Sequence, residues 1–217
     1  MRFNELSSTK QKIILASEKL FREHGYHNTS MRMLADACEM AVGNLCYHYP
    51  KKEDILMEDH NILMDAFRGQ IAELEKQEDP WVTYVAAEFC FLLRISQDRE
   101  ILDLYRQVIN IPTLRQDYYM KHHELLEMYF SAKDFGLTEH QFYMSTVAFS
   151  ALCFQGLEQY DEHHPEELRE DLIKTFETRL LFLGLDPFEK DEAIRSGMEL
   201  GRREFEKISN KELFYGA

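Results

Sequence analysis

The sequence has few cysteines, few prolines and no long apolar run. Its cysteines form no CxxC pair, so a disulfide framework is not expected; they are Cys38, Cys46, Cys90 and Cys153. The first five residues lack the apolar core of a secretion signal. Apolar stretches such as 147–154 and 180–185 are far too short to span a bilayer. We therefore expect a soluble, cytoplasmic protein.

The sequence also lacks the motifs of common catalytic sites. It contains no HExxH, no GxSxG and no glycine-rich phosphate loop. A helical di-iron oxidase would need Glu-x-x-His pairs, and no glutamate here precedes a histidine by three residues. Residues 161–164 (Asp-Glu-His-His) offer a metal-binding combination, but they precede Pro165 in a polar stretch and are interpreted as a solvated loop. We predict no enzyme activity, no catalytic residue, no metal and no cofactor.

No segment alternates apolar and polar residues as a half-buried strand does; apolar residues recur instead at helical spacing. Helix starts are marked by Asp79-Pro80, by Pro112 and by Thr138 with Gln141, and a helix end by Gly184. The predicted helices of this part of the chain span 53–77, 81–96, 98–109, 112–133, 139–160, 166–183 and 187–208. The predicted fold class is all-α.

Residues 30–52 have the pattern of a helix-turn-helix. Leu34 and Ala35 would pack the first short helix, and Leu45 would anchor the second. A preceding helix, capped by Ser8 or Thr9 and stopped by Gly25, would complete a three-helix unit. Such a unit lays its second helix in a DNA major groove. The alternative is a helical hairpin that binds nothing.

Over residues 9–56 the sequence resembles the tetracycline-repressor (TetR) family of bacterial transcription regulators. The resemblance rests on Ile13, Leu20-Phe21, His24-Gly25-Tyr26, Thr29–Arg32, Leu34-Ala35, Gly43–Leu45, Tyr47–Tyr49 and Lys52–Leu56. It implies a DNA-binding domain at 1–52 and a helical effector-binding and dimerisation domain at 53–217. Beyond residue 56 the chain resembles the family only in length and helical character.

The resemblance also implies a set of DNA-contacting residues, some of which suit that role chemically. Arg32 is a fork-shaped donor for guanine or phosphate, and Asn44 can bond a base edge. Tyr47 and His48 can donate to phosphates, and Lys52 can meet phosphate through its charge. The full set is Ser30, Met31, Arg32, Ala41, Val42, Gly43, Asn44, Cys46, Tyr47, His48 and Lys52.

The helix-turn-helix departs from the family pattern at several positions. Glu39 stands where the turn usually has glycine, so either the turn avoids positive φ or Glu39 is strained. Ala41 replaces a capping Ser or Thr, and Lys51 stands where a capping Ser is common. Val42 and Cys46 take positions that are often polar or aromatic, although Val42 could contact a thymine methyl. These departures keep open the alternative of a helical ligand-binding or scaffold protein with weakened DNA binding.

Charge is distributed unevenly along the chain. Residues 1–60 carry eight Lys or Arg and nine Asp or Glu, so nearly all of the net charge of −14 lies in the remaining residues. This acidity argues against a non-specific nucleic-acid coat protein. It is compatible with a regulator whose acidic domain points away from the duplex.

Two late helices are predicted to form a homodimer interface. Helix 166–183 carries an apolar stripe, and helix 139–160 carries small residues that allow close helix approach. The residues predicted at this interface are Ser145, Ala148, Leu152, Leu168, Leu172, Phe176 and Leu180. The alternative is that they form core within one subunit.

An aromatic-rich region between the head and these helices is the predicted effector pocket. Ligand pockets are mostly apolar with few polar groups. The candidate ligand-binding residues are Phe91, Arg94, Tyr105, Tyr119, His122, His123, Phe142 and Phe154. Ordinary core packing is the alternative for each of them.

The function predicted from these features is a DNA-binding transcriptional regulator, a repressor that a small-molecule effector releases from operator DNA. Its predicted partners are double-stranded operator DNA, an unidentified effector and a second copy of the chain, without a membrane. Helix 53–77 would connect the DNA-binding unit to the pocket and move one when the other changes. A helical-bundle enzyme is the least favoured alternative.

Overall fold

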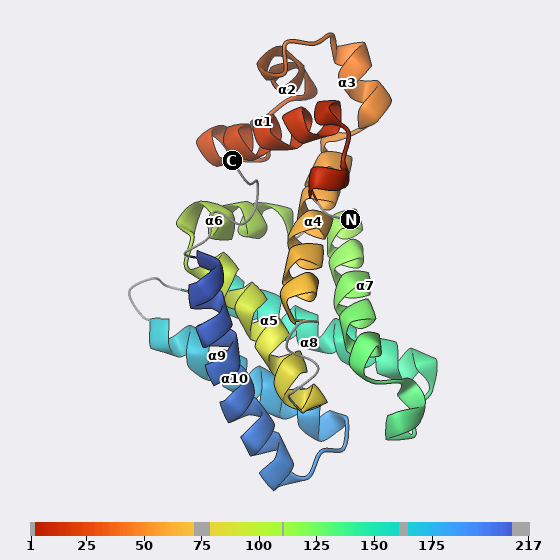
Figure 1. Ribbon diagram of the computed structural model, residues 1–217, viewed down its shortest axis with the longest axis vertical. Helices are drawn as coiled ribbons and strands as arrows, with labels where there is room; N and C mark the ends of the chain where they lie inside the picture. Colours follow the sequence, from red (N-terminus) through yellow and green to blue (C-terminus); the bar gives the residue numbers. More distant parts are fainter. Residues whose placement is uncertain (1–2, 72–78, 110, 161–164, 210–217) are drawn as a thin grey trace.

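The computed structural model describes residues 3–71, 79–109, 111–160 and 165–209, and every regular element in these ranges is a helix. A small head (α1–α3) lies at one end, α4 descends from it, and the remaining helices form a larger body (Figure 1). The elements are η1 (Phe3–Glu5), α1 (Ser8–His24), α2 (Met31–Ala37), α3 (Val42–His48), α4 (Lys52–Ile71), α5 (Pro80–Ser96), α6 (Arg99–Val108), α7 (Pro112–Tyr129), η2 (Ala132–Phe135), α8 (Glu139–Gln159), α9 (Pro165–Phe182) and α10 (Pro187–Ser209). The all-α prediction is confirmed.

The head is a three-helix unit around a small apolar core. The first helix is capped by Ser7, one residue before the predicted cap, and ends at Gly25, whose φ of 78° suits glycine. Leu34, Ala35 and Leu45 are fully buried in one cluster that fixes α2 against α3. The predicted role of these three residues in packing is confirmed.

The fourth helix belongs to the cores of both head and body. Its Ile55 and Ile62 pack into the head cluster, whereas Leu56 packs with Phe21 and with Leu104 of α6. With 20 residues, α4 is about 30 Å long. Residues 72–77, the rest of the predicted helix, lie outside the described residues. The proposed boundary at residue 52 therefore cuts the sequence where α4 begins, not where contacts between the units end.

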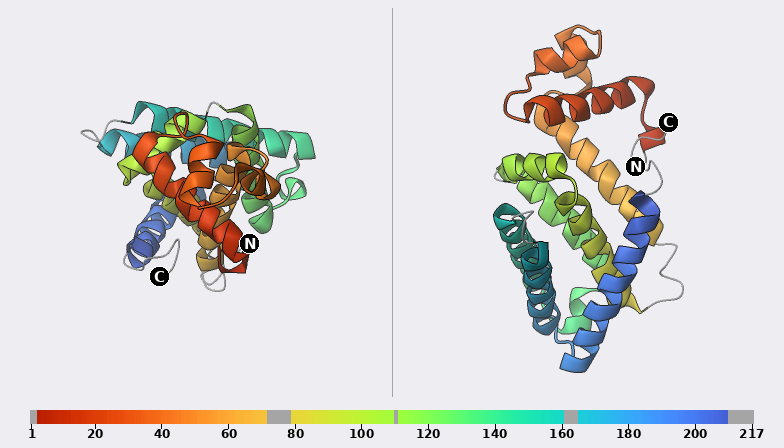
Figure 2. Two further views of the ribbon diagram at one scale, coloured as in Figure 1. Left: turned by 90° about the horizontal axis from the view of Figure 1, so that it is seen from above. Right: turned by 90° about the vertical axis from the view of Figure 1, so that its left-hand side faces the viewer.

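The body is built around α5, which is buried along almost its whole length. The last helix lies directly against it, because a Cβ at Gly197 would stand 2.6 Å from the Val85 Cβ and one at Gly201 would stand 2.9 Å from the Ala86 carbonyl oxygen. The other large helix pair of the body is α8 with α9 (Figure 2). Prediction placed most helix boundaries within one or two residues, and the Asp79 cap, with Pro80 after it, and the Thr138–Gln141 capping box are confirmed.

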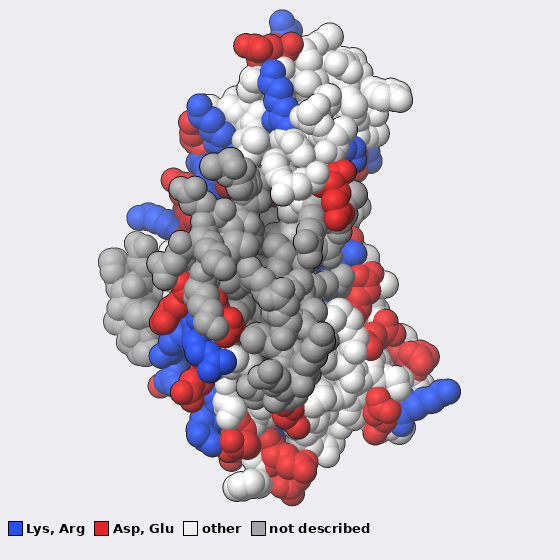
Figure 3. All heavy atoms as spheres, viewed as in Figure 1, with Lys and Arg blue, Asp and Glu red and all other residues white. Residues whose placement is uncertain are grey.

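Two further findings concern the described surface. Within the described ranges, no helix is both long and apolar enough to cross a membrane. On the face drawn in Figure 3, the head carries charged side chains of both signs beside an uncharged area, and Asp and Glu gather over the lower body. The predicted loop at 161–164 lies outside the described residues.

Candidate DNA-binding head and ligand cavity

The second helix of the helix-turn-helix presents an uncharged surface to solvent. Leu45 is buried and ties α3 to the head, while Val42, Gly43 and Asn44 are exposed around it. Tyr47 is the most exposed large side chain here, at 85%, with its ring edge-on to His48 at 5.3 Å between centroids. The geometry therefore offers a tyrosine hydroxyl, an amide and a valine methyl surface on one short helix.

The other predicted DNA-contacting residues flank that surface or support it. The Ser30 hydroxyl accepts from the Met33 N–H at 3.2 Å and caps α2, and Arg32 is exposed on the first turn. Met31 is half-buried against the head core, and Cys46 and His48 are half-buried on α3. Ala41 is exposed at the N-terminus of α3.

Lys52 is committed to contacts inside the head. Its ammonium donates to the carbonyl oxygens of Tyr26 at 2.6 Å and Thr29 at 3.0 Å, and lies 4.2 Å from the centre of the Tyr26 ring. Burial lowers its pKa from the usual lysine value. The side chain therefore braces the loop between α1 and α2, and its contact with phosphate stays a prediction.

The turn of the helix-turn-helix carries backbone strain. Glu39 has φ of 54°, the left-handed conformation that disfavours any residue with a Cβ. The strained alternative posed by the sequence is therefore the one adopted. Ala41, the N-cap of α3, makes no side-chain cap hydrogen bond, as its replacement of Ser or Thr predicted.

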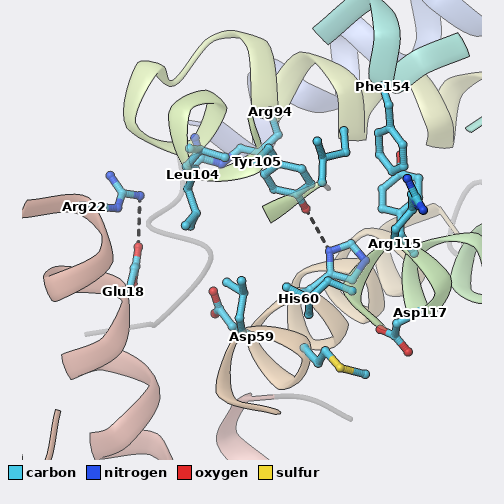
Figure 4. A pocket seen from close by; sticks show the side chains of 16 residues that line it. Glu18, Arg22, Asp59, His60, Arg94, Leu104, Tyr105, Arg115, Asp117 and Phe154 are labelled. Atoms are coloured by element: carbon cyan, nitrogen blue, oxygen red, sulfur yellow. Dashed lines mark hydrogen bonds and ion pairs between the residues drawn. The ribbon is translucent and has the colours of Figure 1, made fainter. Parts of the chain in front are cut away.

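A cavity of about 100 Å³ lies where head and body meet (Figure 4). Helix α1 of the head and helices α4, α5, α6, α7 and α8 all contribute side chains. The lining residues are Glu18, Arg22, Leu56, Met57, Asp59, His60, Arg94, Ile101, Leu104, Tyr105, Ile109, Leu114, Arg115, Asp117, Tyr118 and Phe154. The cavity thus contacts the DNA-binding head directly.

The predicted ligand-binding residues divide into three groups. Arg94, Tyr105 and Phe154 line the cavity. Behind that wall lie Phe91 and His122, which pack on the ring of Tyr118, and Tyr119, which packs on Phe154. A separate site holds His123 and Phe142, whose ring centroids are 5.3 Å apart beside Thr146.

Prediction missed His60 and Asp117, the two lining residues with unpaired buried atoms. The His60 Nδ1 lies 2.9 Å from the Tyr105 hydroxyl oxygen. The His60 Nε2 and the Asp117 Oδ2 are buried and have no hydrogen-bond partner among the described residues. Polar residues at such positions are common on the solvent side of a helix, so the sequence alone did not indicate that these two line a cavity.

Burial controls the protonation of these two groups. It lowers the pKa of His60 to about 3, with smaller contributions from the charges of His122 and Lys121, so the imidazole is neutral near pH 7. Burial also raises the pKa of the Asp117 carboxyl, against the opposing charge of Lys121. A neutral imidazole and a partly desolvated carboxyl group therefore face the same cavity.

Helix α6 is attached to the head at both of its ends. The Arg22 guanidinium lies 3.6 Å from the Asp98 carboxylate, which caps α6, and 2.9 Å from the carboxylate of Glu100. At the other end, the Tyr26 N–H donates to the Gln107 Oε1 at 2.9 Å. Because the residues between these attachments line the cavity, a displacement of α6 acts on the head at two points.

A buried contact between a histidine and a glutamate lies behind the cavity wall. The His122 Nδ1 is 2.6 Å from the Glu88 Oε2, and the two side chains are 1% and 0% exposed. The Tyr84 hydroxyl donates to the other oxygen of Glu88 at 3.3 Å. The ring of His122 stacks on Tyr118 at 3.9 Å between centroids, so the pair supports a residue that lines the cavity.

Most residues predicted at a dimer interface are buried inside the chain itself. Leu168, Leu172, Phe176 and Leu180 are at most 6% exposed in the body core, and Ser145 is buried as well. That part of the prediction is corrected: the apolar stripe of α9 turns toward its own α8 and α10. Of the predicted set, Ala148 and Leu152 are exposed. Met144, Leu181 and Phe182 are exposed apolar side chains as well.

Comparison with known proteins first defines the class of the head. Residues 13–58 match the bacterial regulatory proteins of the tetR family. Over 71 residues the chain is 30% identical to the HTH-type transcriptional regulator UidR of Escherichia coli K12, an alignment that covers 31% of this chain. The matched segment spans only 36% of the length of that relative.

Solved structures extend the likeness to the rest of the fold. FadR of Thermus thermophilus, a TetR-family repressor solved with lauroyl-CoA, superposes with a TM-score of 0.60 at 17% identity, covering 82% of this chain and 96% of FadR. RolR, solved with resorcinol, superposes with a TM-score of 0.56 at 16% identity, covering 86% of this chain and 92% of RolR. The head therefore matches the tetR family of bacterial regulatory proteins over residues 13–58, and the chain shares the fold of these TetR-family structures.

Proposed function

We propose that the protein is a DNA-binding transcriptional regulator whose affinity for operator DNA is set by a small molecule. Residues 1–52 form the DNA-binding head, and 53–217 form the effector-binding and dimerisation body. The observation that carries the proposal is the exposed face of α3, where Val42, Asn44 and Tyr47 stand out from a helix anchored by buried Leu45. A helix presented in this way fits a DNA major groove. We propose no enzymatic activity.

Binding of successive half-sites requires two heads, and we propose that α8 and α9 supply the dimer contact. Their outward faces carry Met144, Leu152, Leu181 and Phe182, which are 44–57% exposed in the single chain. Apolar area of this kind is stabilised by burial in a four-helix bundle with a second copy. The two heads would then lie about 34 Å apart, one turn of DNA, or at a multiple of that spacing.

We propose that the protein acts as a repressor and that effector binding in the cavity releases it from DNA. The cavity lies against α6 and α4, and both helices are attached to the head. An effector that favours a displaced α6 would reorient the heads, and operator DNA must weaken effector binding by the same factor. The effectors bound by FadR and RolR, lauroyl-CoA and resorcinol, differ greatly in size, so these structures do not define a common effector class.

The test of this function is binding to the DNA upstream of the protein's own gene, measured by fluorescence anisotropy against a scrambled duplex. Asn44→Ala should weaken binding to the specific duplex by about 1–3 kcal/mol and leave random DNA almost unaffected. Asn4→Ala, an exposed asparagine outside the helix-turn-helix, is the matched control. Equal affinity for specific and scrambled duplexes would contradict the proposal.

The dimer is tested in the same preparation. Leu152→Glu places a charge in the proposed contact and should give a monomer by light scattering, with a large loss of operator affinity. Leu15→Glu is the matched control, since Leu15 is 43% exposed on α1 and Leu152 is 46% exposed on α8. A dimer that survives Leu152→Glu would place the contact elsewhere.

The second candidate is a ligand-binding protein with weakened DNA binding. It is favoured by the strained Glu39 and the uncapped start of α3, which both reduce the stability of the reading helix. In that case effector binding would be retained, and the anisotropy experiment would show equal affinity for the upstream and the scrambled duplex.

A further inference from the structure

We propose that the cavity binds a small, uncharged, hydroxylated aromatic ring, with a ring hydroxyl bonded to His60 or to Asp117. This inference rests on the proposed function, because it names the chemical class of the effector for the cavity between head and body. The side chains that carry it are His60, Asp117, Tyr105, Tyr118 and Phe154.

The volume of the cavity limits the size of the ligand. The cavity holds about 100 Å³, whereas pockets for drug-sized ligands hold roughly 300–1,000 Å³. An apolar cavity of about 150 Å³ admits benzene. The cavity opens to solvent on one side, so one aromatic ring fits with a small adjustment of the wall, whereas most of an acyl chain joined to a nucleotide would lie outside it.

Shape favours a flat ring over an aliphatic ligand. Tyr105, Tyr118 and Phe154 present aromatic walls, and the Tyr118 and Phe154 rings lie 4.3 Å apart between centroids. Aromatic rings gain contact energy in offset or edge-to-face arrangements beyond the area they bury. Leu104 and Ile101 supply an apolar floor from α6.

The unpaired atoms identify the functional group. The Asp117 Oδ2 is buried and, within the described chain, has no hydrogen-bond partner, so a donor from a ligand or a water molecule would satisfy it. The His60 Nε2 is likewise buried and has no hydrogen-bond partner among the described residues. Whether it donates or accepts depends on the proton shared by His60 Nδ1 and the Tyr105 hydroxyl. A hydroxyl group can donate to Asp117, and it can meet either tautomer of His60.

Two of the three arginines that line the cavity are already paired. Arg22 is paired with Glu18 (Figure 4) and with Asp98 and Glu100, and Arg94 is paired with Asp98, while the side chain of Arg115 is exposed. A carboxylate ligand would compete with these pairs and would meet Asp117 with like charge.

The test is calorimetric titration of the full-length protein with single-ring probes. Phenol and the three dihydroxybenzenes are compared with toluene, benzoate and laurate. The best dihydroxybenzene should bind at least about tenfold more tightly than toluene, because each hydroxyl that satisfies a buried group contributes about fivefold. Benzoate and laurate should bind more weakly than phenol. Tighter binding of toluene, benzoate or laurate would overturn the proposal, as would no heat from any hydroxylated ring at millimolar concentration.

Substitutions separate a ligand role from a packing role. Asp117→Leu removes a carboxyl group that has one buried, unpaired oxygen, so it should leave the melting temperature unchanged or higher while it weakens phenol binding at least about fivefold. Glu127→Leu makes the same change on the exposed side of α7 and should leave phenol affinity unaltered. His60→Phe keeps the ring shape and should also weaken phenol but not toluene. Unchanged phenol affinity in Asp117→Leu and His60→Phe would overturn the assignment.

Operator binding is measured separately on the same samples. Binding of operator without binding of hydroxylated rings would refute the ligand class alone. Binding of the rings without any specific duplex would refute the regulator and leave the ligand class standing.

Discussion

Head and body bury polar groups in opposite ways. In the head, the buried side chains of Ser17 and Thr29 each donate to a backbone carbonyl of their own unit. In the body, the buried set includes an acid, two histidines and an arginine, Glu88, His122, His123 and Arg179. Local hydrogen bonds hold the head in one arrangement, whereas these buried ionisable groups of the body have partners on other helices. The body is therefore where a ligand can shift the balance between arrangements.

The largest loss of stability is expected when one partner of the buried Glu88–His122 contact in the body is removed. Glu88→Leu leaves the His122 imidazole without its carboxylate, and we expect a loss of about 3–5 kcal/mol in the free energy of unfolding. Thr29→Val is the matched change in the head and should cost only about 1 kcal/mol, the value of one local hydrogen bond. Urea denaturation of both variants gives the two numbers.

A double variant tests whether the loss of stability comes from the unpaired His122 side chain. Glu88→Leu combined with His122→Leu should recover part of the loss, because no polar group is then left unpaired. Equal losses in Glu88→Leu and Thr29→Val would show that the body tolerates its charges as easily as the head tolerates its hydroxyls.

The second prediction concerns the joint between the two regions. Arg22→Ala should leave operator affinity within a few-fold of the original while it reduces the effect of effector on that affinity by about 1–2 kcal/mol. The physical reason is that α6 loses its ionic attachment at Asp98 and Glu100, and is then held to the head by the hydrogen bond of Gln107 with Tyr26 and by the packing of Leu104. Paired titrations of DNA with and without effector measure it.

Lys19→Ala is the control for that experiment, because its ammonium pairs only weakly, at 3.9 Å, with Glu23 on the exposed side of α1. Full coupling in Arg22→Ala would mean that the ionic attachment of α6 carries none of the coupling between cavity and head.

The sequence predicted the head more completely than the body for a physical reason. Leu34, Ala35 and Leu45 act through local helical spacing, and Gly25 through its backbone, so their positions in the sequence determine their roles. Lys52 was the exception, since its carbonyl partners come from a loop more than 20 residues earlier.

The body's cavity depends on long-range packing instead. Arg94, Tyr105 and Phe154 were identified by residue type, but which aromatic side chains face the cavity is decided by the packing of six helices. The apolar stripe of α9 was equally readable and was assigned to the wrong partner, because spacing reveals a buried face without revealing what buries it. His60 and Glu18 reach the cavity from α4 and α1, a contact that no periodicity predicts.

The smallest predicted effect concerns the head, where the backbone of Glu39 is strained. Glu39→Gly removes the cost of a Cβ at φ 54°, about 1–2 kcal/mol, but it adds backbone freedom to the unfolded chain. The net gain in the free energy of unfolding should be about 0.5–1 kcal/mol. Glu39→Ala keeps the strain and removes only the exposed contact with Lys12 at 3.5 Å, so it should give no gain. Thermal denaturation of the two variants isolates the backbone contribution. If Glu39→Ala stabilised the protein as much as Glu39→Gly, the cost would lie in the glutamate side chain and not in the left-handed turn.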